Sequence, residues 1–364
     1  MSSDPPSAPK SAARPRLRAP TAHDVARLAG VSQSAVSRAF TPGASVSAET
    51  RERVSRAAAE LGYRPNLFAR SLIKRESSLV GVVIPDLVNP FYAALLERLS
   101  AELRALGYRV LLFNTRLSED ADPVLDEVLN YQVAALILVS STLNSGLADE
   151  CRRIGLPVVQ LNRVAAGATV SSVVGDNAQG AHTIAKFLLA GGHERIAFMA
   201  GLDTSSTNRE REDAFVAALR EEGVALHARV SARYSPELAR EAARELLSSP
   251  TPPDAIFCAN DHMAIPALSV ARHEFGLRPG ADVSIIGFDD APLSAWPEIS
   301  LTTYRQPFDE MAIRAVEIVA RKIEHEVLEP STVVLTGELV VRGSARRPAG
   351  AVDRAGGATW PPKV

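Results

Sequence analysis

Seven short apolar runs, separated by amphipathic stretches, constrain the fold of this chain more than any other feature. They read LVGVVIP (79–85), YRVLLFN (108–114), AALILVS (134–140), PVVQLN (157–162), RIAFMAG (195–201), DAIFCAN (254–260) and VSIIGFD (283–289). Strands that are apolar throughout are typical of parallel sheets covered on both faces. Helices are expected between them, at Pro90–Leu106, Asp122–Tyr131, Ala178–Ala190, Arg209–Glu222 and Pro236–Leu247. The pattern predicts an α/β fold of βαβ units in doubly wound parallel sheets.

Seven strands are many for one sheet, and a chain of 364 residues is long enough for two or three domains. We therefore expect two lobes, with a ligand bound between them outside the carboxyl ends of the strands. Polar residues follow the strands at that edge: Asp86, Asn89, Asn162, Arg163, Asp203 to Thr207, Asn260, Asp261, Asp289 and Asp290. Asn and Asp are also ordinary turn and cap residues, so a structural role stays open for each of them.

The run TAHDVARLAGVSQSAVSRAF (21–40) predicts two short helices with a tight turn between them. Thr21 and Asp24 have the spacing of a capping box, Gly30 can end the first helix, and Ser32 can cap the second. The second helix would bury Val36 and expose Gln33, Ser34, Ser37 and Arg38, which can donate to base edges and phosphates. An ordinary solvated helix face is the alternative for this pattern.

A third helix is expected between the cap at Ser47 and Gly62, which completes a three-helix unit of the helix-turn-helix kind. After it, Pro65 suits a first helical turn, and residues 66–73 could form two turns. So short a helix is marginal in water, so we expect it to fold only on contact with a partner.

The net charge of −2 conceals an asymmetry between the two ends of the chain. Residues 1–75 contain 13 Lys and Arg against 5 Asp and Glu, a net charge of +8, which leaves −10 for the remainder. A basic head on an acidic body is the electrostatic pattern expected for a polyanion partner such as nucleic acid. The alternative is a solvated basic arm, because four of these charges lie in the first eighteen residues.

Other classes of protein find little support. No apolar run approaches the ~20 residues of a membrane span, and the first twenty residues lack the apolar core of a secretory signal. The two cysteines, Cys151 and Cys258, fit buried thiols of a reducing cytoplasm. No dinucleotide, phosphate-loop, HExxH or CxxC motif is present, so we expect no catalytic residues, no metal ligands and no cofactor.

Five short motifs stand out near the N-terminus: Asp24-Val25-Ala26, Ala29-Gly30-Val31-Ser32, Val36-Ser37-Arg38, Arg64-Pro65-Asn66 and Ala69-Arg70-Ser71-Leu72. With these motifs the chain resembles the lactose/galactose repressor family, and the resemblance extends from about Thr21 to Ser344. It implies a homodimer on a palindromic operator in double-stranded DNA, with hinge helices that open the central minor groove. Gln33, Ser34 and Arg38 would then read bases, and Thr21, Ser32, Ser37, Tyr63 and Asn66 would hold phosphates. Leu72 matches the apolar wedge between base steps, for which a hinge-closing core leucine is the alternative.

The same resemblance implies that the body is a sensor similar to periplasmic sugar-binding proteins. It places the effector against Phe91, Tyr92, Asn162, Arg211, Tyr234, Asn260 and Asp289. A guanidinium fork and a carboxylate can each engage two neighbouring hydroxyls, and an aromatic ring can cover the apolar face of a sugar. A sugar or sugar derivative is therefore expected, although a nucleobase or nucleoside would also stack on the aromatic pair.

These observations predict a cytoplasmic transcriptional regulator, most simply a repressor. The expected order is a disordered basic arm (1–20), a helix-turn-helix domain (21–64), a hinge helix and linker (65–76), a two-lobed effector domain (77–344) and a disordered tail (345–364). Lobe 1 would comprise about 77–175 and 305–335, and lobe 2 about 176–304 and 336–344. Two alternatives are a solute-binding protein without a regulatory role and an architectural DNA binder whose body only dimerises.

Overall fold

The computed structural model describes residues 19–41, 43–64, 77–115, 127–128, 130–140, 145–164, 170–354 and 356–360. The chain divides into two compact units, residues 1–76 and 77–364, which are described separately below.

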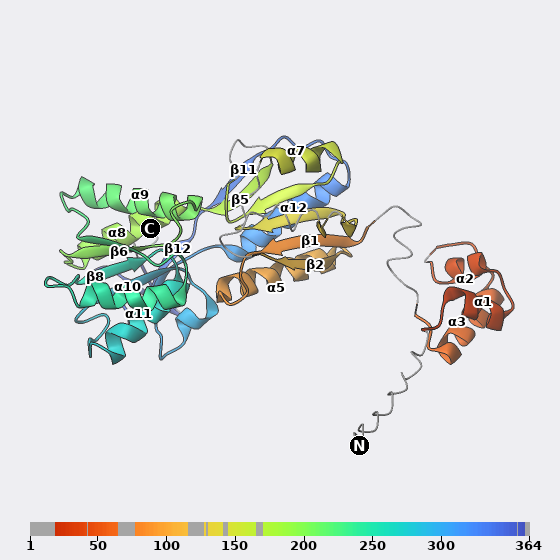
Figure 1. The fold of residues 1–364 in the computed structure, drawn as a ribbon, viewed down its shortest axis with the longest axis horizontal. Coiled ribbons are helices and arrows are strands. Elements are labelled where there is room, and N and C mark those ends of the chain that lie inside the picture. Colours follow the sequence, from red (N-terminus) through yellow and green to blue (C-terminus); the bar gives the residue numbers. More distant parts are fainter. Residues whose placement is uncertain are drawn as a thin grey trace, which may run out of the picture. The chain divides into compact units, whose positions relative to one another are not determined.

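The described residues of the first unit form three helices around a small apolar core. They are α1 (Ala22–Ala29), α2 (Gln33–Ala39) and α3 (Ala48–Leu61), drawn in red to orange in Figure 1. Thr21, Ser32 and Ser47 each cap a helix with the side-chain oxygen. Each helix contributes a valine to the core, and these valines, Val25, Val36 and Val54, are at most 1% exposed. The predicted three-helix arrangement is therefore present.

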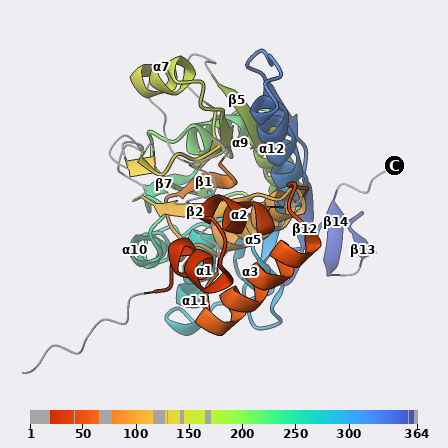
Figure 2. The same ribbon diagram turned by 90° about the vertical axis from the view of Figure 1, so that its right-hand side faces the viewer.

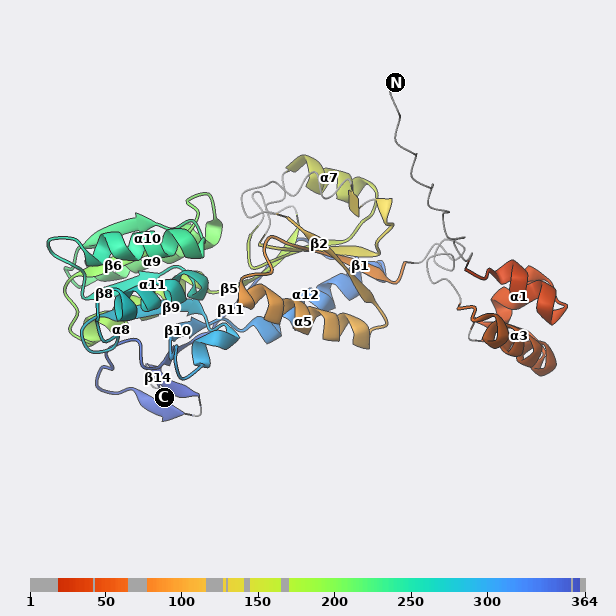
Figure 3. The same ribbon diagram turned by 60° about the horizontal axis from the view of Figure 1, so that its bottom comes forward.

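The part of the second unit that the structure describes forms two sheets. The first has the order β11-β5-β4-β3-β1-β2, and all its strands are parallel. They are β1 (Leu79–Ile84), β2 (Arg109–Asn114), β3 (Ala135–Val139), β4 (Val158–Leu161), β5 (Ser171–Gly175) and β11 (Thr332–Leu335). Helices α5 (Pro90–Ala105) and α12 (Phe308–Ile323) pack together on one face, and α7 (Ser145–Arg153) contributes to the core of the other face (Figure 3).

The second sheet has the order β13-β14-β12-β10-β9-β8-β6-β7. Its parallel strands are β6 (Ile196–Ala200), β7 (Ala228–Ser231), β8 (Ala255–Cys258), β9 (Ser284–Asp289) and β10 (Thr302–Arg305). Strands β12 (Glu338–Val341), β13 (Val352–Arg354) and β14 (Gly357–Trp360) complete it in antiparallel fashion. Helices α8 (Asn177–Ala190) and α9 (Ser206–Glu221) pair on one face, and α10 (Pro236–Leu247) and α11 (Asp261–His273) pair on the other (Figure 1).

The chain passes between the two sheets three times. The crossovers follow β5, β10 and β11, at residues 175–177, 305–308 and 335–338. The short 3-10 helix η1 (Pro292–Ala295), which follows β9, packs against α5 of the other lobe, and Ala291 lies in that lobe's core. The carboxyl ends of the parallel strands are therefore adjacent to the crossovers, where a site for a ligand is expected.

One prediction about the body is wrong. Residues 345–364 were expected to be disordered, yet β13 and β14 form a hairpin that pairs with β12 (Figure 2). Trp360 packs edge-on against Phe187, with ring centroids 5.7 Å apart. The Gly- and Ala-rich composition suggested a flexible tail, but β12 leaves one edge of backbone N–H and C=O groups open, and the hairpin satisfies them.

Candidate functional site

The exposed face of α2 carries the side chains that were predicted to read DNA. Gln33, Ser34, Ser37 and Arg38 are exposed, while Val36 is 1% exposed. The Ser34 hydroxyl already shares a 2.9 Å hydrogen bond with that of Ser32. Gln33 and Arg38 therefore offer the less committed polar groups on this face.

Thr21 and Tyr63 both hold the head together. The Thr21 hydroxyl donates to Asp24 Oδ2 at 2.7 Å, and the Thr21 backbone N–H donates to the same oxygen at 3.0 Å. The Tyr63 ring packs against Phe40 with centroids 6.0 Å apart, and burial raises the pKa of its hydroxyl. Their predicted phosphate contacts would add to these structural roles.

Two arginines of α3 have a role that the sequence analysis missed. Arg51 Nη1 donates to the carbonyl of Ala39 at 2.6 Å, and Arg53 Nη2 donates to the carbonyls of Ala29 at 2.5 Å and Gly30 at 3.2 Å. These carbonyls lie at the C-terminal ends of α2 and α1, where cations are favourable. Two of the positive charges counted for the head therefore serve the fold.

Several predicted features lie outside the described residues. They are the basic arm up to residue 18, the hinge segment 65–76, and with it Asn66 and the wedge Leu72.

The second lobe buries an arginine beside a carboxylate at the carboxyl ends of its strands. Arg211, on α9, is 2% exposed, and Nη2 lies 3.8 Å from Oδ1 of Asp289 at the end of β9. Its Nε donates to Asn177 Oδ1 at 2.9 Å, and Nη1 donates to the carbonyl of Ala259 at 2.5 Å. The guanidinium carbon lies 3.7 Å from the centroid of the Phe288 ring, which fixes the plane of the fork.

The separation of this pair is too long for a hydrogen bond. Arg211 Nη2 donates to none of the described residues. The Asp289 carboxylate accepts from the described residues only through Oδ1, from Gln306 Nε2 at 2.7 Å. A ligand hydroxyl between the two groups could accept from one and donate to the other. Asp289 has a φ of 125°, a strained backbone conformation of the kind found at functional sites. Burial raises the pKa of this carboxyl, and Arg211 opposes the rise.

Tyr234 was predicted as an aromatic wall and is held by a close backbone approach. It has a φ of 62°, is 8% exposed, and its hydroxyl lies 3.3 Å from Thr207 Oγ1. A Cβ on Gly201 would lie 2.2 Å from this ring, so only glycine allows the ring its position. The ring is therefore fixed at the same edge of the sheet as the end of β6.

Asn260 and Asp261 serve the fold more than the sequence analysis implied. Asn260 Oδ1 caps α11 by accepting from the Met263 N–H at 3.0 Å. Asp261 is 1% exposed and accepts from Ala291 N, Ser294 Oγ and Thr303 Oγ1 at 2.8, 2.7 and 2.5 Å. Burial and the neighbouring charge of Asp289 raise its pKa, while these three donors lower it. The carboxylate thus ties α11 to η1 and β10.

The first lobe contributes Tyr92 and Asn162. Burial raises the pKa of Tyr92 to about 12, and this hydroxyl contacts Ser140 and interacts electrostatically with Asp289 and Tyr234 of the second lobe. Asn162 has a φ of 68° and donates to Ser140 Oγ at 2.8 Å, and its buried Oδ1 accepts from none of the described residues. Both side chains therefore share a contact to Ser140, and the Tyr92 hydroxyl lies near Asp289 and Tyr234.

Phe91 lies in the apolar core of the first lobe. It is 2% exposed and packs edge-on against Tyr92 and Phe308, with centroids 5.5 and 6.5 Å apart. Its surroundings are those of a core residue that supports Tyr92.

Four other polar residues at strand ends have structural partners. Asp86 accepts from the Val88 N–H at 2.8 Å, and Asn89 caps α5. Asp203 and Asp290 form ion pairs with Arg229 and Arg305, at 2.5 and 2.7 Å. A structural role is therefore observed for each of these four residues.

The structure also shows a Ser–His–Asp cluster at the opposite edge of the second sheet. Ser284 Oγ lies 2.8 Å from His193 Nε2, and His193 Nδ1 lies 3.3 Å from Asp254 Oδ1. Ser284 is 0% exposed, His193 is 3% exposed, and Ser284 Oγ accepts from the Arg346 N–H at 2.8 Å. No substrate can reach a serine that is so enclosed, so the cluster has a structural role and joins segments of the second sheet.

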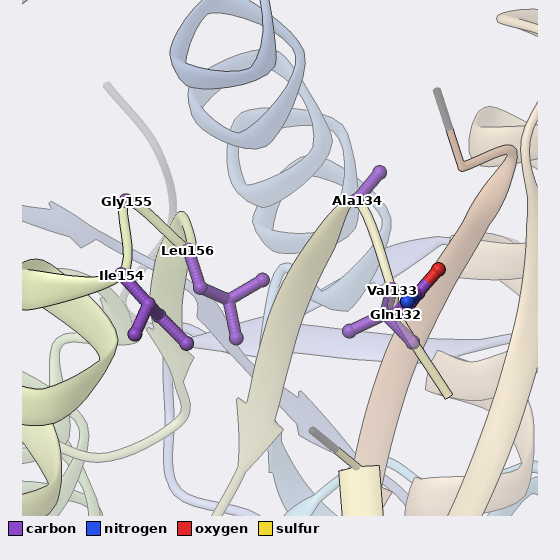
Figure 4. Close-up of a pocket in the computed structure, with 6 residues that line it drawn as sticks. All are labelled: Gln132, Val133, Ala134, Ile154, Gly155 and Leu156. Carbon is purple, nitrogen blue, oxygen red and sulfur yellow. The ribbon is translucent and has the colours of Figure 1, made fainter. Parts of the chain in front are cut away.

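A cavity in the first lobe lies away from these residues. It has a volume of about 270 Å³ and is lined by residues 132–134 and 154–156 (Figure 4). These segments precede β3 and β4, so the cavity lies at the amino ends of the strands. Among the described residues, no cluster of His, Cys, Asp or Glu could hold a metal ion, and no described helix is long and apolar enough to cross a membrane.

Comparison with known proteins agrees with both units. Residues 21–66 match the family of bacterial regulatory proteins of the lacI type, and residues 185–345 match a periplasmic binding protein-like domain. The HTH-type transcriptional repressor CytR of Escherichia coli (strain K12) is 32% identical over 337 residues, which is 92% of this chain and 98% of CytR. Catabolite control protein A of Priestia megaterium is 31% identical over 330 residues, 90% of this chain and 99% of that protein.

Solved structures show the same arrangement of elements. The lac repressor dimer bound to operator and the anti-inducer ONPF superposes with a TM-score of 0.78 at 28% identity, over 90% of this chain and 100% of that chain. The complex of the transcriptional regulator CelR with cellobiose gives 0.67 at 30% identity, with the same coverage.

A helix-turn-helix head joined to a two-lobed α/β sensor defines a DNA-binding transcriptional regulator that responds to a small molecule. The chain belongs to the lacI family of bacterial regulatory proteins. The predicted resemblance and fold class are thereby confirmed.

Proposed function

We propose that this protein is a cytoplasmic repressor whose operator affinity is set by a polyhydroxylated effector, a sugar or sugar derivative. The observation that carries the proposal is the buried Arg211–Asp289 pair, whose 3.8 Å separation leaves donors and an acceptor for vicinal hydroxyls. Tyr234 would cover the apolar face of the ring, and Tyr92 and Asn162 would contact the effector from the first lobe. The CelR structure with cellobiose supports the choice of ligand class.

On the DNA side, we propose that Gln33, Ser34 and Arg38 contact base edges in the major groove. Thr21, Ser32, Ser37, Tyr63 and Asn66 would position the head on phosphates, and Leu72 would enter the minor groove. One short recognition helix makes few base contacts, so a homodimer on a palindromic site is expected.

The effector class is tested by tryptophan fluorescence of the full-length protein. Both tryptophans, Trp296 and Trp360, lie in the second lobe and report on it. We expect saturable changes with a member of a panel of mono- and disaccharides. Asp289→Asn should weaken that binding at least tenfold, because hydrogen bonds to charged groups contribute about 1.5–3 kcal/mol. Asp203→Asn, at an exposed carboxylate of the same lobe, is the control and should not.

If nucleosides bind and saccharides do not, the effector is a nucleoside and the proposed ligand class is wrong. If no member of either panel changes the fluorescence, the sensor proposal is contradicted. The DNA function is tested separately by selecting bound sites from random DNA with the full-length protein. A symmetric consensus that is lost with Arg38→Ala is expected, whereas asymmetric or random enrichment would contradict a homodimer on a palindrome.

A further inference from the structure

Two buried amide side chains lie in the crossovers between the lobes. Asn177 is the last residue of the crossover at 175–177 and the first residue of α8, and is 2% exposed. Gln306 lies in the crossover at 305–308 and is 1% exposed. Changes in backbone dihedral angles at such segments are what alter the angle between two lobes. Groups that are hydrogen-bonded to these two amides can therefore influence the angle between the lobes.

Asn177 holds the arginine of the proposed effector site. Its Oδ1 accepts from Arg211 Nε at 2.9 Å, while its Nδ2 donates to Glu210 Oε2 at 2.7 Å. Because the second bond fixes which end of the amide faces Arg211, the amide cannot flip without loss of both bonds. A displacement of the guanidinium therefore acts directly on the first residue after the crossover.

Gln306 holds the carboxylate in the same way. Its Nε2 donates to Asp289 Oδ1 at 2.7 Å, and its backbone N–H donates to the Asp289 carbonyl at 3.2 Å. The two charged groups of the proposed effector site are thus each tied to a different crossover.

The two crossovers also touch each other. A Cβ on Gly175, at the end of β5, would lie 2.4 Å from Gln306 Oε1. Gly175 does not have a positive φ, so glycine is required here for the close approach and not for its backbone conformation. The contact joins the crossover that carries Gln306 to the one that leads to Asn177.

We infer that Asn177 and Gln306 are positioning residues that convert occupancy of the effector site into a change of the angle between the lobes. The inference rests on the proposed function for the identity of the site, but the mechanical link can be measured without an effector. A ligand that draws Arg211 and Asp289 toward each other moves both amides, and the contact at Gly175 makes the two crossovers move together. The paired crossovers would then be the two-state element that both the effector and the operator influence.

The first experiment is hydrogen exchange on the free full-length protein. Gln306→Met keeps a side chain of similar length against Gly175 but removes the bond to Asp289, and Gly175→Ala keeps both amides but forces the contact apart. We expect each variant to raise exchange at least threefold in both crossovers, including the Asp176 N–H that donates to Leu335. A change confined to the substituted crossover, or no change, would overturn the inference. Gln179→Ala, on the exposed face of α8, is the matched control and should alter neither crossover.

The second experiment separates binding from coupling. Asn177→Ala and Gln306→Met are titrated with the saccharide that gives the largest tryptophan signal in the wild type, and operator retention is measured with and without it. Allosteric coupling is commonly about 5–150-fold. We expect the ratio between the operator affinities measured without and with the saccharide to fall at least fivefold. The affinity for the saccharide itself should change less than fivefold. Equal losses in affinity and ratio would show an ordinary binding role and overturn the inference. Failure of every saccharide and nucleoside to bind the wild type would contradict the proposed function, while the exchange result would still decide the link between crossovers.

Discussion

Replacement of Arg211 by alanine should destabilise the second lobe even without any effector. The side chain is 2% exposed, donates two hydrogen bonds to buried acceptors, and is the cation nearest to the buried carboxylate of Asp289. Removing one partner of a buried charge pair costs about 3–5 kcal/mol. Two charge-assisted hydrogen bonds at about 1.5–3 kcal/mol each give a similar total. In a unit of this size, that loss lowers the midpoint of thermal unfolding by roughly 10 °C.

The pH dependence gives the prediction a sign. Burial raises the pKa of Asp289 and Arg211 lowers it, so without Arg211 the pKa rises further. The folded state then holds a proton that the unfolded carboxyl, with a pKa near ~3.9, has released. Since the folded state binds more protons, the free energy of unfolding increases as the pH falls from neutrality toward about 5, and the deficit of Arg211→Ala should shrink.

The measurement is urea unfolding followed by fluorescence of Trp296 and Trp360 at pH 8 and pH 5.5. Arg211→Ala combined with Asp289→Asn should recover part of the loss at pH 8, because no unpaired charge remains. Arg244→Ala, at an exposed pair with Glu274 in the same lobe, should cost less than about 1 kcal/mol and serves as the control. A deficit below about 1 kcal/mol for Arg211→Ala, or one that responds neither to pH nor to Asp289→Asn, would refute the electrostatic account of this site.

Three further substitutions test other parts of the structure. Gly201→Ala should displace the Tyr234 ring, since the new Cβ would lie 2.2 Å from it. We expect saccharide binding to weaken at least tenfold in fluorescence titrations, with little loss of folding. Unchanged affinity would exclude Tyr234 from the site. Arg53→Ala should lower the free energy of unfolding of the head by about 1–2 kcal/mol and raise amide exchange in α1, because the C-terminal carbonyls of that helix lose a charged donor. Arg56→Ala, at an exposed arginine of the same helix α3, should do neither. Equal behaviour of the two variants would contradict the role assigned to Arg53. Trp360→Ala should lower the midpoint of thermal unfolding of the second lobe by several degrees, because about 2 kcal/mol of packing against Phe187 is lost. An unaltered midpoint would show that the hairpin adds no stability.

Much of the architecture follows from local patterns. All seven apolar runs contain strands of the two sheets, and Thr21, Ser32, Gly30 and Gly62 are at the caps where the sequence placed them. These features depend on residues a few positions apart, for which period and capping chemistry are sufficient. The strands β5, β7, β10, β11 and β12 were not predicted, because polar residues stand within them or at their ends and their stability comes from neighbours in the sheet.

The chain's own order of residues determines the helix-turn-helix head, the alternation that produces parallel sheets, and the recurrence of polar residues after strands, because all of these depend on near neighbours. Tertiary structure alone decided which polar residues face one another: Arg211 meets Asp289 across 78 positions of sequence, while Asp86, Asn89, Asp203 and Asp290 turn to caps and ion pairs. It also turned the C-terminal segment into a hairpin, because the unpaired edge of β12 exists only once the second sheet has formed. Contacts between distant segments depend on how the strands and helices of each lobe assemble, and no local pattern contains that information.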